Sequence, residues 1–154
     1  MMRMVSIFLA RLFLSAVFLA GAVKKLFYWE DAERDLLSAL CDWQTYSGHL
    51  LSVQECMASL MPWSFMLLIL ATVFELFGSL MILFGYKEKI GACLLILLLI
   101  PATFIFHPFW FMEGHAYEIQ SAMFFKNLAI LGGLMLIVLH GAKTRDESDH
   151  SMGM

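Results

Sequence analysis

Apolar residues gather in four long stretches along the chain, separated by polar segments. The stretches cover residues 4–23, 63–86, 90–106 and 127–140, and the last is short unless residues 122–125 extend it. None of them alternates apolar and polar positions as a half-buried strand does. A bilayer core of about 30 Å needs roughly 20 helical residues per crossing. Because lipid admits only helices or closed barrels, the pattern predicts an all-α membrane protein, a bundle of four transmembrane helices.

The polar insertion 29–61, between the first two stretches, has an apolar periodicity of its own. Leu36, Leu40 and Trp43 recur there at helical spacing, and a similar pattern follows further along the insertion. This spacing predicts two short amphipathic helices in the extracytoplasmic loop, lying on the outer membrane surface. The second loop, 107–125, carries aromatic residues of the kind that favour the headgroup level.

Composition narrows the class of protein further. Hydrophobic residues make up 61% of the 154 residues and charged residues 15%, whereas soluble domains average about 45–50% and about 25%. The balance excludes a soluble enzyme, and the net charge of −3 argues against a nucleic-acid partner. We expect one membrane domain over residues 1–142 and a polar cytoplasmic tail over 143–154. The first stretch also resembles a signal peptide, but Arg11 within it favours a retained helix.

Basic residues near the membrane predict the orientation of the chain. The side that holds both termini carries one more of them than the opposite side, so we expect both termini in the cytoplasm. The two sets are Arg3, Lys87, Lys89, Lys143 and Arg145 on the first side and Lys24, Lys25, Arg34 and Lys126 on the other.

Two charges fall near the middle of apolar stretches, Arg11 and Glu75. An unpaired charge at such a depth costs at least about 2.5–3.5 kcal/mol on insertion scales. Arg11 lies 13 residues before Lys24, and Glu75 lies 13 residues after Pro62. If the first two helices are antiparallel, both charges reach the same level, which predicts an intramembrane ion pair between them. Such a pair either fixes the order of the helices or forms a polar, proton-handling site.

A second group of polar residues marks the outer ends of the predicted helices: Lys25, His107, Lys126 and Asn127. Positive donors and a titratable imidazole suit a quinone carbonyl or an anion, with apolar helix faces below to hold a tail. The alternative is that these are snorkelling lysines and an interfacial histidine, which occur at many helix ends.

Other cofactor chemistry finds little support in the sequence. The histidines and acids of the second loop match no established metal spacing, so we predict no metal site, and no haem or flavin site is evident. Cys41 and Cys56 share the extracytoplasmic insertion, where conditions are oxidising. A disulfide between them would close a loop of about 15 residues and contribute roughly 3 kcal/mol. Two free thiols are the alternative.

Four segments of the chain together resemble the DoxX family. The resemblance covers about residues 4–142, and its segments are RLFLSAVFLAGAVKK at 11–25, ELFGSLMILFG at 75–85, FHPF at 106–109 and FKNLAILGG at 125–133. It implies a four-helix protein of the bacterial inner membrane, commonly described as an oxidoreductase subunit. The positions that match the family pattern are Arg11, Lys25, Glu75, His107, Lys126 and Asn127.

Three functional hypotheses follow from these observations. The first is a redox-complex subunit that presents a quinone or a redox partner at the outer leaflet and is not catalytic alone. The second is a non-catalytic scaffold or cargo-binding protein that acts through residues 30–60. A small transporter is the third, although the chain lacks duplicated halves. Besides the lipid bilayer we expect a protein partner in a membrane complex, and homo-oligomerisation stays open.

Overall fold

A computed structural model describes residues 2–48 and 50–141, with side chains from residue 5 onward. The predicted polar tail, 143–154, lies outside the described residues. Among those that are described, no strand occurs. The helices are α1 (Met2–Phe27), α2 (Trp29–Tyr46), α3 (Leu51–Leu60), α4 (Ser64–Phe84), α5 (Glu88–Phe106) and α6 (Gly114–His140), with short 3-10 turns η1 (Met61–Trp63) and η2 (Phe109–Phe111).

Four of these helices, α1, α4, α5 and α6, are long and apolar enough to cross a membrane, which confirms the predicted fold class. The boundaries of the first three agree with the apolar stretches. The fourth helix differs, because α6 begins at Gly114 and not near residue 127. Its first turns contain histidine, glutamate and glutamine, which lower the hydropathy without interrupting the helix. Hydropathy identifies the apolar part of a helix that can lie in lipid, and α6 continues beyond that part at its N-terminal end.

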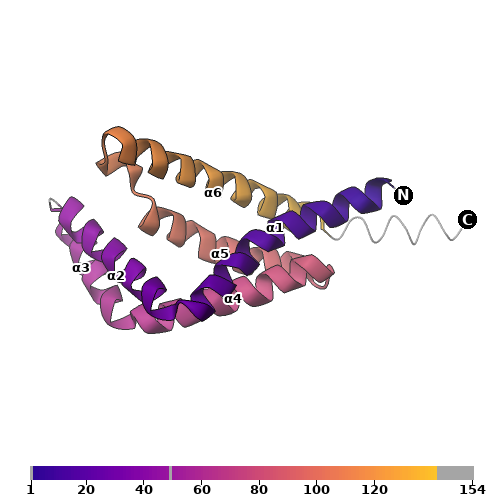
Figure 1. Ribbon diagram of the computed structural model, residues 1–154, viewed down its shortest axis with the longest axis horizontal. Coiled ribbons are helices and arrows are strands. Elements are labelled where there is room, and N and C mark those ends of the chain that lie inside the picture. The colour runs from indigo at the N-terminus through magenta and orange to yellow at the C-terminus, as the bar shows by residue number, and fades with distance from the viewer. Residues whose placement is uncertain (1, 49, 142–154) are drawn as a thin grey trace, which may run out of the picture.

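The four long helices pack in chain order, α1 on α4, α4 on α5 and α5 on α6 (Figure 1). Helices α4 and α5 meet at a tight turn in which Gly85 adopts a left-handed conformation with φ of 66°. Their backbones also approach closely further along, because a Cβ added to Gly91 would lie only 2.7 Å from the carbonyl oxygen of Gly78. We call the turn at Gly85 the α4–α5 end of the bundle and the opposite end the α5–α6 end.

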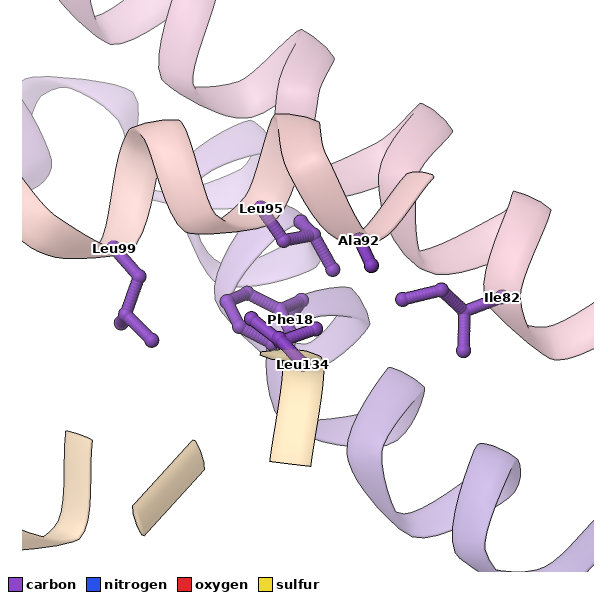
Figure 2. Close-up of a cluster of buried hydrophobic side chains, with 6 residues drawn as sticks. All are labelled: Phe18, Ile82, Ala92, Leu95, Leu99 and Leu134. Carbon is purple, nitrogen blue, oxygen red and sulfur yellow. The ribbon is translucent and has the colours of Figure 1, made fainter. Parts of the chain in front are cut away.

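The core is small and is built from all four long helices. Phe18 of α1 meets α5 and α6 side chains, and Leu134 is the buried residue that α6 contributes (Figure 2). In lipid, helices associate through close packing more than through burial from water, so a narrow core between apolar outer faces is the expected arrangement. The full cluster is Phe18, Ile82, Ala92, Leu95, Leu99 and Leu134.

The insertion forms the two predicted helices, α2 and α3, which pack against each other as a hairpin (Figure 1). The Gln54 side-chain amide donates to the carbonyl oxygen of Gln44 at 3.1 Å, which ties α3 to the end of α2. Leu36 and Leu40 are buried on α2, as their helical spacing predicts. We refer to this unit, residues 29–60, as the α2–α3 hairpin.

Trp43 joins the hairpin to the α5–α6 end of the bundle. Its indole nitrogen donates to the carbonyl oxygens of Phe104 and Ile105, at 3.2 and 3.1 Å. Those carbonyls belong to the last turn of α5, where no donor within the helix is available. The ring also packs edge-on against Trp110 and Phe111, with centroids 5.8 and 5.4 Å apart. The Trp43 side chain therefore supplies a hydrogen-bond donor to the last carbonyls of α5 and attaches the hairpin to that end of the helix.

Of the two alternatives for Cys41 and Cys56, the structure has the two free thiols and not the disulfide, and both residues are exposed. The buried face of α2 carries Leu36 and Leu40, and Cys41 follows one position later, about 100° further round the helix. Cys56 is likewise exposed on α3. The two thiols share a hairpin and point away from its packed faces.

We predict that Trp43→Phe releases the hairpin from the bundle while the four long helices stay packed. The variant leaves two carbonyls of α5 without a donor, which costs about 1–3 kcal/mol. Hydrogen exchange of α2 and α3 should rise in detergent, as mass spectrometry of the amides will detect. Trp63→Phe is the control, since Trp63 is 62% exposed. Equal exchange in both variants would contradict the role given to Trp43.

Candidate functional site

Two ion pairs connect α1 to its neighbours, and their partners differ from the prediction. The Lys25 ammonium lies 2.7 Å from each carboxylate oxygen of Glu75. Arg11 pairs with Glu88, the first residue of α5. The predicted pair between Arg11 and Glu75 is therefore wrong, although each of these two charges is paired.

The relative height of α1 and α4 explains the correction. Gly21 lies beside Glu75, since a Cβ there would be 3.4 Å from the carboxylate, and Gly85 lies beside the Arg11 guanidinium. The two contacts are ten residues apart on both helices, so Arg11 is level with the end of α4. Counting from the ends of the apolar stretches assumed that α1 and α4 span the same depths. In fact this register places the end of α1, where the chain turns into α2, about five residues from the start of α4, and the beginning of α1 extends past the end of α4.

The Lys25–Glu75 pair is largely shielded from the surroundings. The two side chains are 22% and 13% exposed, and the Ser79 hydroxyl donates to the backbone carbonyl of Glu75. The carboxylate packs against α1 at Gly21, where an added Cβ would be in ordinary contact with it at 3.4 Å. Because a charge left alone in such surroundings is strongly destabilising, the pair holds the end of α1 against α4.

Glu88 joins three helices at the α4–α5 end. Its side chain is only 8% exposed, receives the Arg11 guanidinium from α1, and lies against Gly141, where an added Cβ would be 2.6 Å from the carboxylate. Sequence reasoning missed Glu88 because it stands between Lys87 and Lys89, where an acid looks like part of a solvated charged turn. An acid that opens an apolar stretch, opposite an unexplained arginine, is the signal that would have found it.

At the α5–α6 end, two of the predicted site residues make contacts between α5 and α6. The Nδ1 atom of His107 lies 2.7 Å from the side-chain oxygen of Gln120. The side-chain amide of Asn127 donates to the Thr103 hydroxyl at 3.1 Å, and Thr103 in turn donates to the carbonyl of Leu99. Gln120 could not be predicted as a partner of His107, because the segment that forms the start of α6 was expected to be a loop.

An apolar groove of about 70 Å³ lies between α5 and α6 next to these contacts. Its two polar residues are Thr103 and Asn127, and the rings of Phe104 and Phe124 pack edge-on beside them with centroids 5.7 Å apart. The complete lining is Leu99, Ile100, Thr103, Phe104, Phe124, Asn127, Leu128 and Leu131. Polar residues are thus few, and the two present are joined by one hydrogen bond between α5 and α6.

The two predicted lysines do not join this groove. Lys25 is held by Glu75 on α4, and Lys126 is exposed with its ammonium 3.2 Å from the sulfur of Met123 on its own helix. Of the predicted cluster, His107 and Asn127 each make a contact between α5 and α6, with Gln120 and with Thr103. Ligand binding by these residues stays a prediction.

The four spans and the helical fold define a multi-pass integral membrane protein. Comparison with known families then identifies it more closely: the family model of DoxX matches residues 6–108, which is 103 of the 154 residues. The chain belongs to the DoxX family. No curated protein and no solved structure matches it. The match covers α1 to α5, so the contribution of α6 to the groove rests on the structure.

We predict energetic coupling between Lys25 and Glu75. Lys25→Met alone should lower the free energy of unfolding by about 3–5 kcal/mol, because it leaves a shielded carboxylate unpaired. The double variant Lys25→Met/Glu75→Gln should recover much of that loss. Denaturation in mixed micelles measures the free energy of unfolding of wild type, of each single variant and of the double variant. The control cycle combines Lys25→Met with Glu88→Gln, and there the two losses in the free energy of unfolding should add. Coupling in the control cycle but not between Lys25 and Glu75 would contradict the pairing of Lys25 with Glu75.

Proposed function

We propose that this DoxX protein is an integral membrane subunit of a redox complex and that it binds a quinone headgroup in the groove between α5 and α6. The observation that carries the proposal is the polar contact of Asn127 with Thr103 on the wall of an otherwise apolar groove. One N–H of the Asn127 amide is used in this contact. Its second N–H and its carbonyl have no protein partner in the described part of the chain, and they can bind a ligand.

The chemistry of a quinone suits this groove. A quinone is a planar ring with two carbonyl acceptors, and the Asn127 amide supplies a hydrogen-bond donor at the groove wall. Phe104 and Phe124 supply aromatic surface against which such a ring can pack. Leu128 and Leu131 continue the apolar lining and suit an isoprenoid tail.

His107 and its partner Gln120 give the proposed site a route for protons. His107 follows Thr103 by one helical turn, at the end of α5, so the imidazole lies beyond the groove toward the α5–α6 end. An imidazole can accept or release a proton near neutral pH, which a quinone needs when it is reduced or oxidised. The chain would supply binding, orientation and proton transfer, while electrons pass between the quinone and a partner protein.

The proposed location follows from the distribution of basic residues. With both termini in the cytoplasm of a bacterial cell, the α5–α6 end and the α2–α3 hairpin face outward from the inner membrane. The groove then opens in the outer leaflet, where a membrane-soluble quinone is available and a partner on the outer surface can reach the hairpin.

We predict that Asn127→Leu removes bound quinone from the protein. The protein is reconstituted in nanodiscs that contain ubiquinone or menaquinone, repurified, and its retained quinone is extracted and quantified. Wild-type protein should retain quinone near one per chain, and the variant should lose most of it because the donor at the groove wall is gone.

Lys126→Ala is the matched control for this experiment. It changes the neighbouring residue, which is exposed and lies outside the groove lining, so quinone retention should be unchanged. If wild type retains no quinone, or if Asn127→Leu retains as much as wild type, the proposed binding site is wrong.

A second candidate function is a scaffold that captures a basic soluble partner on the α2–α3 hairpin. The observation that favours it is the distribution of charge on the hairpin, which carries six acids and one arginine between residues 29 and 60. Within the part of the chain that the structure describes, Asp31 is the exposed hairpin acid that forms an ion pair, and its partner is Arg34. The exposed acids are Glu30, Asp31, Asp35, Asp42 and Glu55.

We predict that Asp35→Lys/Asp42→Lys abolishes binding of a lysine-rich soluble cytochrome, used as a probe. Both residues are exposed, so the hairpin should stay folded while the attraction is reversed. Binding is followed by sedimentation with proteoliposomes at low and high salt. Salt-sensitive binding to wild type that survives the charge reversal would argue against this surface.

A further inference from the structure

Two serines lie between the two ion pairs at the centre of the bundle. Ser15 follows Arg11 by one turn on α1, and Ser79 follows Glu75 by one turn on α4. Both serines are fully buried, and the helices that carry them pack against each other (Figure 1). Each ion pair is therefore followed, one helical turn closer to the other pair, by a buried serine hydroxyl.

The heights of these groups can be compared through the register of α1 and α4. With Gly21 beside Glu75 and Gly85 beside Arg11, the two serines differ in height by about two residues, or roughly 3 Å. Each serine lies roughly 6 Å along the helix axis from the charged residue one turn away. Successive polar groups thus cross the apolar centre in short steps.

The Ser15 hydroxyl is a buried polar group without a hydrogen-bond partner among the described residues. The Ser79 hydroxyl, in contrast, donates to the carbonyl of Glu75. Buried hydroxyl groups in proteins are almost always hydrogen-bonded, and where no protein group serves, an internal water that makes about three such bonds commonly does. Ser15 is therefore the natural place for water inside this bundle.

We propose that the interface of α1 and α4 conducts protons across the centre of the membrane, through water held at Ser15 and Ser79, between the Lys25–Glu75 and Arg11–Glu88 pairs. Each transfer breaks one O–H bond and forms another, so no electron is moved and no atom is lost. The two carboxylates accept and release the proton at the ends of the path. The driving force is the proton gradient or the potential across the membrane.

The surroundings restrict such a path to protons. Phe18 and Ile82, each three residues from one of the serines on the same helix, are buried, so apolar side chains and no wide polar lumen adjoin the path. Lys25 and Arg11, at the two ends, repel other cations. The path lies on α1 and α4 and does not involve the groove between α5 and α6. Proton conduction and quinone binding can therefore be tested independently of each other.

Proton flux into vesicles tests the proposal. The full chain is reconstituted in phospholipid vesicles that lack quinone and contain a pH-sensitive dye. A potassium gradient with valinomycin then sets the potential, and the change in internal pH is recorded. Wild type should conduct faster than empty vesicles, and Ser15→Val should fall to the level of empty vesicles because the hydroxyl is lost. Ser15→Thr, which keeps a hydroxyl, should conduct.

Ser59→Ala is the control, because the Ser59 hydroxyl lies in the hairpin, where it donates to the carbonyl oxygen of Cys56 on its own helix. Its removal should leave the flux unchanged. Circular dichroism verifies the folding of each variant, and Ser79→Ala replaces Ser15→Val if the larger side chain prevents folding. Flux in wild type equal to that of empty vesicles overturns the proposal. So does undiminished flux in a folded variant that lacks the hydroxyl.

Discussion

Everything in this bundle depends on the need to neutralise charges that lie among apolar helices. Lys25 meets this need through Glu75, and Arg11 through Glu88. Because a lone charge in such surroundings is strongly unfavourable, the two pairs determine how far α1 extends along α4. They also decide where the chain leaves α1 and turns into α2, and hence where the α2–α3 hairpin begins.

The proposed working parts follow from that placement. The hairpin crosses from α4 to the α5–α6 end, where Trp43 binds the last carbonyls of α5 and contacts the aromatic residues beside the groove. Phe104 connects the groove with the aromatic residues that Trp43 contacts. It lines the groove, and its ring centroid lies 6.0 Å from that of Trp110. A partner held on the hairpin would thus lie close to a quinone in the groove, whereas the polar interface of α1 and α4 is a separate feature of the bundle.

Much of the fold could be predicted from the sequence, and much of the pairing could not. Hydropathy located the spans and the amphipathic spacing located the hairpin, because both are local properties of the chain. The charged residues Arg11 and Glu75 were recognised, but their partners depend on the register between helices, which no local pattern encodes. The same limit applies to Gln120 and Trp43, whose partners lie on other helices, and to the two cysteines, whose direction depends on which face of the hairpin is packed.

The most direct test of the account measures the height of α1 against α4. Two doubly spin-labelled proteins are compared, one labelled at Val17 and Phe77 and the other at Val17 and Leu70. All three positions are exposed, and the two α4 positions lie on the same face of that helix, two turns apart. The register described here places Val17 about 3 Å in height from Phe77 and about 14 Å from Leu70. Pulsed electron spin resonance on a cysteine-free background should therefore give the shorter distance for Val17 and Phe77. A shorter distance for Val17 and Leu70 would place Arg11 level with Glu75 and contradict the account.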